Sequence, residues 1–198
     1  MQFIIAIISY FIGSIPFSFL IPKYIGQVDI RKVGSGNTGT TNVVRTLGLK
    51  VGVLAFIGDF LKGVLPTLIG LMTLGTKGAI IGGGLAVLGH CYPVWLKFKG
   101  GKGIATSAGV LVVLTPNVFF ILLALQFAII FATRYMSLAS IISGALFPVL
   151  CMLLSKPSEV VLFAALLGAF VIYRHQANLK RLIKGEEKKL TIGSKKRV

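Results

Sequence analysis

The sequence has 198 residues, of which 55% are apolar and 13% are charged, with a mean hydropathy of +0.90. About a quarter of the residues of a soluble domain are charged, so a water-soluble fold of this composition would expose large apolar patches. Lysine and arginine outnumber aspartate and glutamate by 21 to 5, but the apolar content argues against nucleic acid as the partner of this charge. The composition predicts a single integral membrane domain, residues 1–198.

Apolar segments suited to transmembrane helices follow one another along the chain. They comprise residues 2–22, 51–72, 78–95, 105–115, 117–133, 136–154 and 159–173. The first segment has no basic n-region and no cleavage site, so we expect a retained span rather than a cleaved signal peptide. Pro116 should separate the short segment 105–115 from the next one, because proline removes a backbone donor.

The positions of the basic residues predict how many segments cross the membrane. Most lysines and arginines lie in residues 23–50, in residues 96–104 and from Arg174 onward. The positive-inside rule places all three regions in the cytoplasm, which an all-α fold achieves with seven transmembrane helices, the N-terminus outside and the C-terminus inside. Lys77 and Lys156 then lie in outer loops. Five spans with two re-entrant segments give the same sidedness and form the alternative.

The cysteines and the ionisable residues of the apolar segments give no indication of a metal site. Cys91 and Cys151 lie in apolar segments without metal-ligand spacing, so we expect them to be small buried residues. Asp59 and Lys62 lie three residues apart inside the second span and share one helix face. Because an intramembrane ion pair is costly, we expect it to lock neighbouring helices; direct contact with a substrate is the alternative.

The first basic region contains the run Gly-Ser-Gly-Asn-Thr-Gly-Thr-Thr-Asn-Val-Val-Arg, residues 34–45. Its glycines allow consecutive backbone amides to surround an anion. Arg45 presents a planar fork that holds phosphate through two bonds. Neutral hydrogen-bonding groups accompany these features at Ser35, Asn37, Thr40 and Asn42. The run predicts a phosphate-binding segment, with an ordinary glycine-rich turn before a capped helix as the alternative.

The second region combines Gly-His-Cys-Tyr-Pro at 89–93 with Phe-Lys-Gly-Gly-Lys-Gly at 98–103. Glycines flank Lys102, which makes it the stronger phosphate ligand, whereas for Lys97 and Lys99 membrane topology is the alternative to ligand binding. The run is not a Walker A loop, because a glycine rather than serine or threonine follows the lysine. His90 fits either a ligand contact or a satisfied histidine at a helix end.

The third region, residues 175–187, begins where the last span ends. In a helix, His175 and Asn178 share one face with either Arg181 or Leu182. If this face points toward the other two regions it completes a site; a basic helix lying on anionic lipid is the alternative.

Together the three regions resemble the motifs of the bacterial membrane acyl-phosphate:glycerol-3-phosphate acyltransferases, the PlsY family. The motifs comprise Gly34-Ser-Gly-Asn-Thr-Gly-x-Thr-Asn-x-x-Arg45, Gly89-His-x-x-Pro with Phe98-Lys-Gly-Gly-Lys-Gly103, and His175-x-x-Asn-x-x-Arg-Leu-x-x-Gly-x-Glu187. The match spans almost the whole chain, and Leu179, where isoleucine is expected, is one mild departure. The resemblance implies transfer of a fatty acyl group from acyl phosphate to the 1-hydroxyl of glycerol 3-phosphate. The products are lysophosphatidate (lysophosphatidic acid) and phosphate, in the first step of bacterial phospholipid synthesis.

The resemblance also implies the place and the partners of the reaction. It implies a multi-pass protein of the bacterial inner (plasma) membrane with its active site at the cytoplasmic face. Its partners would be glycerol 3-phosphate, acyl phosphate and membrane lipid, without nucleic acid, metal, cofactor or acyl-enzyme intermediate.

Roles for individual residues follow from the motifs and from the chemistry of acyl transfer. We expect catalytic contributions from Ser35, Arg45, Lys102, His175 and Asn178. Arg45 and Lys102 would bind phosphate, Ser35 and nearby amides would donate to phosphate or the oxyanion, and Asn178 would orient a substrate. Either His175 or the substrate's own phosphate would take the hydroxyl proton. We expect substrate-binding residues, some of which act by holding the loops in shape, at Gly34, Gly36, Asn37, Thr40, Asn42, His90, Lys99, Gly100, Gly101, Gly103, Arg181, Gly185 and Glu187.

Two other classes of protein stay open at this point. A phosphate-ester transporter would place its cations near the middle of the membrane, reachable from both sides, whereas nearly all cations here lie on one predicted side. A structural protein has no need of three glycine-rich phosphate segments.

Overall fold

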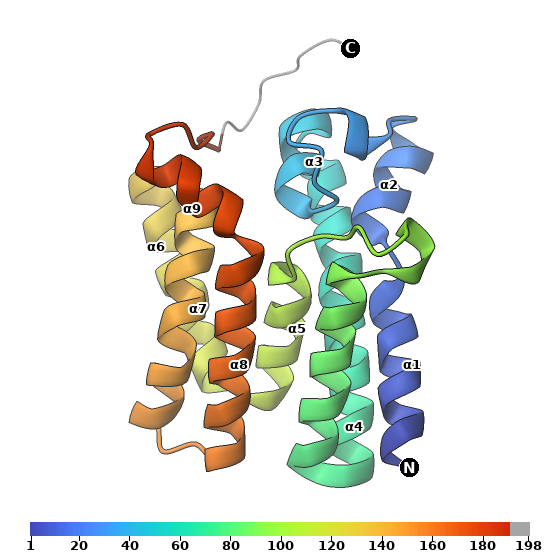
Figure 1. Cartoon of the computed structure of the whole chain (residues 1–198), viewed down its shortest axis with the longest axis vertical. Helices are drawn as coiled ribbons and strands as arrows, with labels where there is room; N and C mark the ends of the chain where they lie inside the picture. The colour runs from blue at the N-terminus through green and yellow to red at the C-terminus, as the bar shows by residue number, and fades with distance from the viewer. Residues whose placement is uncertain (191–198) are drawn as a thin grey trace. The chain divides into compact units, whose positions relative to one another are not determined.

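The computed structural model describes residues 1–190, and every regular element within them is helical, which confirms the all-α expectation (Figure 1). The α-helices are α1 (Gln2–Ser14), α2 (Phe17–Ile25), α3 (Thr40–Leu47), α4 (Leu49–Cys91), α5 (Ile104–Leu114), α6 (Pro116–Thr133), α7 (Met136–Leu153), α8 (Ser158–Arg174) and α9 (Gln176–Ile183). Two short 3₁₀ helices are η1 (Ile30–Lys32) and η2 (Val94–Leu96). The basic residues 195–197, which contribute to the predicted sidedness, lie outside the described residues. The described chain forms two compact units, residues 1–110 and 111–190.

The centre of the first unit is α4, which folds back on itself to form two antiparallel arms (Figure 1). Leu74 and Gly75 leave helical geometry at the fold, and Gly75 has a φ of +61°. The backbones of the arms approach closely because Gly70 lies against Gly78 and Gly82 lies against Pro66. Small residues allow this close packing of helices in a membrane. The two spans predicted at 51–72 and 78–95 therefore correspond to the two arms, although the second arm already ends at Cys91.

The first predicted span is interrupted after α1. Ile15 is extended and Pro16 precedes α2, so the chain changes direction between Ser14 and Phe17. The backbone breaks here because proline lacks the amide that would continue the helix. The break exposes the Ile15 carbonyl to side chains from other elements.

In the second unit, α6, α7 and α8 follow one another with short connections. Pro116 occupies the first turn of α6 and separates it from α5, as predicted. Gly168 of α8 packs against Gly144 of α7. The chain bends by 61° between α8 and α9, so the third motif begins at a sharp corner.

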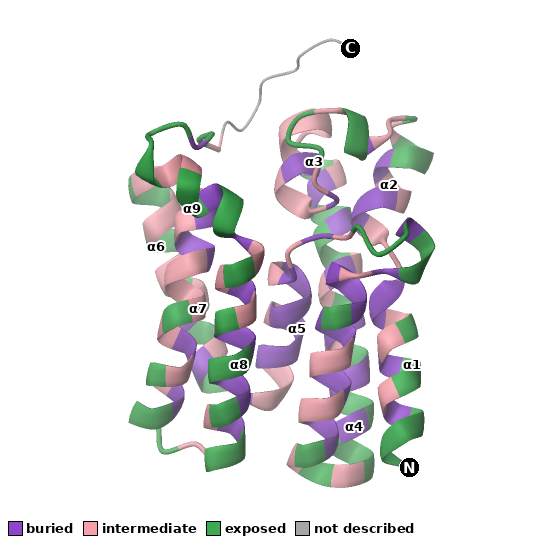
Figure 2. Cartoon of the chain, in the orientation of Figure 1, coloured by how far each residue is buried: buried purple, intermediate pink, exposed green. Residues whose placement is uncertain are grey.

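By length and composition, four segments within the described residues are suited to crossing a membrane: Gln2–Ile25, Leu49–Leu96, Pro116–Thr133 and Met136–Leu153. The bent pair of α8 and α9 makes a fifth candidate, and α5 is shorter. Many large apolar residues are exposed, among them Phe3 at 85% and Phe131 at 91%, and exposed positions recur along the helices in Figure 2, as expected where lipid is the solvent. That seven helices cross the membrane, with the N-terminus outside and the C-terminus inside, stays a prediction.

Candidate active site

The first motif forms a tight turn followed by the short helix α3, so the predicted loop contains a helix. Asn42 is buried beneath the turn and binds it at four points. Its Nδ2 donates to the carbonyls of Ile30 (3.0 Å), Val33 (3.1 Å) and Asn37 (3.2 Å), and its Oδ1 accepts from the Ser35 amide (2.9 Å). Asn42 therefore shapes the turn from inside.

The backbone amides of this turn are largely used within the turn itself. The Gly36 amide donates to the Val33 carbonyl, and the Gly39 amide donates to the Asn37 carbonyl. With the Ser35 amide bound to Asn42, three amides of the expected anion-binding nest are already satisfied. These three amides therefore have partners within the protein, and phosphate binding by this turn stays a prediction.

The side chains of the first motif differ in their exposure. Ser35 lies exposed on the turn, while Asn37, Thr40 and Arg45 are half-buried. Arg45 lies in the last turn of α3. A neighbouring arginine, Arg31, is committed elsewhere, because its guanidinium bonds both carboxylate oxygens of Asp29 at 2.9 and 2.8 Å.

The Asp29–Arg31 pair also shows how the chain enters the motif. Asp29 caps η1 by accepting from the Arg31 amide. The hydrogen bond from the Arg31 side chain lowers the pKa of Asp29 to about 2, so this carboxylate stays charged at neutral pH. The pair fixes Arg31 on Asp29 just before the first motif.

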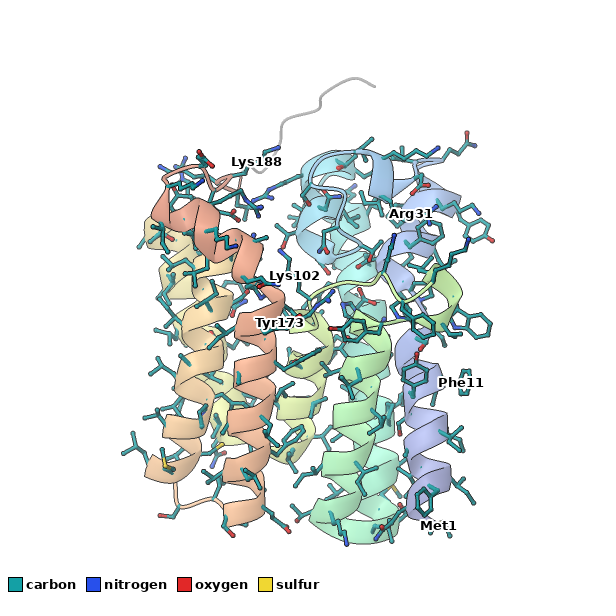
Figure 3. All side chains as sticks on the ribbon, viewed as in Figure 1. Met1, Phe11, Arg31, Lys102, Tyr173 and Lys188 are labelled. Carbon is teal, nitrogen blue, oxygen red and sulfur yellow. The ribbon has the colours of Figure 1, made fainter. Side chains whose placement is uncertain are left out.

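The second motif runs back against the end of α4. The amides of Gly100 and Gly101 donate to the carbonyls of Cys91 (3.1 Å) and His90 (3.2 Å). Lys102 follows, half-buried between two buried glycines (Figure 3). It lies two residues before the N-terminus of α5, whose amide dipoles favour an anion. Lys99 is exposed and lies outside this arrangement.

Gly101 brings the first two motifs together. A methyl group added at Gly101 would collide with the His90 ring and with the Thr38 carbonyl of the first motif. Only glycine permits this close approach. Within residues 1–110, the structure thus joins the segments that carry Ser35, Arg45 and Lys102.

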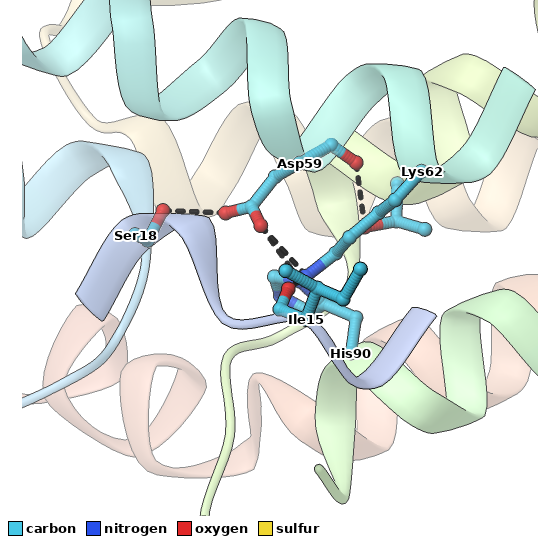
Figure 4. A network of polar contacts seen from close by, with 6 residues as sticks. Ile15, Ser18, Asp59, Lys62 and His90 are labelled. Carbon is cyan, nitrogen blue, oxygen red and sulfur yellow. Dashed lines mark hydrogen bonds and ion pairs between the residues drawn. The ribbon is translucent and has the colours of Figure 1, made fainter. Parts of the chain in front are cut away.

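His90 itself is buried beneath this contact. Its Nδ1 lies 3.6 Å from Asp59 Oδ1, and Asp59 forms an ion pair with Lys62 at 2.7 Å (Figure 4). Of the two interpretations of His90, the geometry favours a histidine at a helix end whose ring contacts protein groups rather than a ligand. The expectation that Asp59 and Lys62 lock neighbouring elements is confirmed, because Asp59 also accepts from Ser18 of α2 at 2.5 Å.

The third motif, in the second unit, is organised around Glu187. Asn178 Nδ2 and the Ser137 hydroxyl donate to Glu187 Oε1 at 2.7 and 2.8 Å, and Arg181 Nε donates to Oε2 at 2.7 Å. Burial raises the pKa of Glu187, but these hydrogen bonds outweigh it and hold the pKa below its usual range. Asn178 and Arg181 do share one face, as predicted. The sequence carries no signal for Ser137, because it lies in an apolar segment 50 residues before Glu187.

Gly185 shapes the end of α9. It has a φ of +72°, its amide donates to the Leu182 carbonyl, and the Glu186 amide donates to the Arg181 carbonyl. This pair of bonds is a Schellman motif, which requires a residue in the left-handed region. Gly185 therefore directs Glu187 back to the helix, in line with the expectation that it holds the third motif in shape.

His175 lies at the corner between α8 and α9 and is buried. Its Nδ1 lies 2.8 Å from the Val171 carbonyl. A carbonyl only accepts, so Nδ1 carries the proton in the neutral ring and Nε2 is the basic nitrogen. The corner thus presents a histidine in a fixed tautomer, as a general base requires.

In comparisons with known proteins, the matching family model and similar relatives carry the same name. The family model described as Glycerol-3-phosphate acyltransferase matches residues 3–185. Proteins named glycerol-3-phosphate acyltransferase share 47% identity over 185 residues in Syntrophomonas wolfei (93% of this chain, 95% of that one) and 40% over 187 residues in Bacillus subtilis (94% and 96%).

The fold is similar to crystal structures of PlsY (YgiH), an integral membrane glycerol 3-phosphate acyltransferase. The glycerol 3-phosphate form gives a TM-score of 0.91 at 42% identity, covering 96% of both chains. The lysophosphatidic acid form gives 0.89 at 41% identity, covering 95% of this chain and 94% of that one.

Proposed function

We propose that this chain, which belongs to the glycerol-3-phosphate acyltransferase family, transfers a fatty acyl group from an acyl phosphate to the 1-hydroxyl of glycerol 3-phosphate. Family membership confirms the resemblance drawn from the three motifs. The observation that supports the acceptor most directly is the likeness, at a TM-score of 0.91, to a structure holding glycerol 3-phosphate. The likeness to the lysophosphatidic acid form supports the product.

The chemistry of the first two motifs suits substrates that both carry phosphate. Arg45 and Lys102 supply two cations on segments that meet at Gly101, and charge-assisted bonds to phosphate are about twice as strong as neutral ones. We assign Lys102, which lies among the glycines of the second motif, to the phosphate of glycerol 3-phosphate, and Arg45 to the phosphate that departs from the donor. The exposed Ser35 hydroxyl donates to a phosphate oxygen or to the developing oxyanion.

The third motif supplies the proton acceptor in this proposal. The glycerol oxygen attacks the acyl carbon, its proton passes to Nε2 of His175, and the carbon–oxygen bond to phosphate breaks, the phosphate leaving with the bonding electrons. Asn178 orients a substrate, and Glu187 fixes Asn178. Participation of both units in one reaction rests on the motif resemblance.

Direct transfer without an acyl-enzyme follows from the nature of the donor. An acyl phosphate is already activated, so alignment and electrostatic stabilisation suffice. Ser35 has neither a histidine nor a carboxylate in its own motif to complete a triad. We place the reaction at the cytoplasmic face of a bacterial plasma membrane, because the basic motifs lie there by the positive-inside rule.

The proposal is tested with purified protein in lipid vesicles. Palmitoyl phosphate and glycerol 3-phosphate should yield lysophosphatidate and inorganic phosphate in equal amounts, and palmitoyl-CoA should yield none. Product from palmitoyl-CoA but not from palmitoyl phosphate would overturn the assignment of the donor. Failure with every donor would overturn the acyltransferase proposal itself.

A further inference from the structure

A buried polar network around Asp59 joins α4 to α2, to α5 and to the break after α1 (Figure 4). The side chains of Asp59 and Lys62 are only 1% and 2% exposed. Lys62 Nζ donates to the Ile15 carbonyl at the break between α1 and α2 (2.6 Å), and the Thr106 hydroxyl of α5 donates to the Asp59 carbonyl (2.9 Å). The network therefore ties the first arm of α4 to both halves of the broken first helix and to α5.

The network reaches the second motif through His90. One side of the His90 ring faces Asp59, with Nδ1 at 3.6 Å from Oδ1. The opposite side, at Nε2, lies against Gly101, and the His90 carbonyl accepts the Gly101 amide. Lys102 follows Gly101 directly, so the His90 ring lies between the Asp59 carboxylate and the segment that carries Lys102.

A structural lock alone does not account for this choice of residues. Replacing a buried ion pair with apolar side chains of similar size is often neutral for stability or favourable, so apolar residues would hold these helices together equally well. A carboxylate 3.6 Å from the ring nitrogen adds what apolar packing lacks, because its negative charge favours an orientation in which the N–H edge of the imidazole faces it.

We propose that Asp59, Lys62 and His90 are positioning residues, which hold the Gly100–Gly101 segment and thereby place Lys102 where the phosphate of glycerol 3-phosphate binds. This inference rests on the proposed function. Asp59 orients the His90 ring, Lys62 balances the charge of Asp59, and the ring supports Gly101 from below. The three residues act on the acceptor through Lys102 and touch neither substrate.

The test compares steady-state kinetics of variants in lipid vesicles. Asp59→Leu combined with Lys62→Met removes the ion pair without leaving a buried charge unpaired. This double variant and His90→Leu should each raise KM for glycerol 3-phosphate by about tenfold, with KM for palmitoyl phosphate unchanged. His90→Asn should retain a KM close to the wild-type value, because its amide nitrogen occupies the place of Nδ1.

Combining His90→Leu with the double variant decides whether the residues act as a unit. Members of one network give non-additive effects, so the triple variant should show no further rise in KM. Thr67→Val is the matched control: Thr67 is buried in the same arm, but its hydroxyl donates to the Gly63 carbonyl of its own helix, and its KM should equal that of wild type.

Each alternative outcome has a distinct meaning. An inactive wild type contradicts the proposed function, whereas an active wild type with unchanged KM in both the double variant and His90→Leu contradicts the positioning role. Effects that multiply in the triple variant show that His90 acts independently of Asp59, which also overturns it. If the double variant fails to fold, as judged by its thermal transition, an unchanged KM in His90→Leu is sufficient to overturn it.

Discussion

Among single residues, Arg45 and Lys102 differ from the other basic residues of their segments. Arg31, Lys97 and Lys99 are exposed. Arg45 and Lys102 are half-buried, and attraction between charges strengthens as the surrounding dielectric falls. Two cations in this position are therefore worth more to a phosphate than the exposed lysines.

Removing either cation should nearly abolish acyl transfer. Arg45→Ala and Lys102→Ala should each lower kcat/KM by about a hundredfold or more, as loss of a preorganised electrostatic contact does. Folded protein, measured by thermal unfolding in detergent, should be retained. Lys97→Ala, just before the glycine-rich part of the second motif, is the control and should keep the full rate. Full activity in both test variants would contradict the assigned roles.

Removal of His175 should change how the rate depends on pH. A histidine base must be neutral to accept a proton, so the wild-type rate should fall as the pH drops through the range in which imidazole becomes protonated. His175→Ala should lower kcat by about a hundredfold or more. The residual rate of this variant should no longer fall as the pH drops through the same range. A variant whose rate still falls there would assign the proton to the substrate phosphate instead.

At the scale of elements, the sequence predicts where helices break and which residues share a helix face, but it does not predict hydrogen bonds between distant residues. The break at Pro116 and the shared face of Asn178 and Arg181 were predictable, because both follow from local geometry. The inward turn of Asn42 was not, since its partners Ile30 and Val33 depend on how the whole turn folds. For the same reason, a neutral polar residue in a motif can be mistaken for a ligand.

The third motif should lose its order when Glu187 is neutralised. The depressed pKa of Glu187 means that its stabilising effect is present above the ordinary glutamate pKa and is lost as the pH falls through the folded value. Glu187→Gln should therefore reduce the hydrogen-exchange protection of α9 roughly tenfold at neutral pH, since bonds to a charged group contribute about 1.5–3 kcal/mol.

Two comparisons complete the measurement on α9. The wild type should lose the same protection on acidification below the ordinary glutamate range, whereas Glu187→Gln should show little further change. Glu186→Gln, at the exposed neighbouring position, is the matched control and should leave α9 protected. Equal protection in Glu187→Gln and wild type at neutral pH would show that Glu187 does not organise the motif.

At the scale of the whole molecule, the distribution of charge is the strongest constraint on topology. The net charge of +16 is concentrated in the three motif regions, and the rule that cytoplasmic segments are basic places these regions on one side. Within the first unit, α4 folds back at Leu74–Gly75, so Lys77 begins the arm that leads to the second motif. A shared active site requires the cations to face one aqueous compartment.

Cysteine labelling with a membrane-impermeant maleimide tests this sidedness. Both native cysteines are buried, so single cysteines introduced elsewhere will dominate the labelling. Lys32→Cys, Lys97→Cys and Lys184→Cys should react only in inverted vesicles, whereas Lys77→Cys and Lys156→Cys should react in intact cells. Labelling of position 77 from the inside would favour the five-span alternative, because the arms of α4 would then form a re-entrant pair. Labelling of positions 32 and 97 from opposite sides would separate Arg45 from Lys102 by the bilayer, and no common phosphate site could then exist.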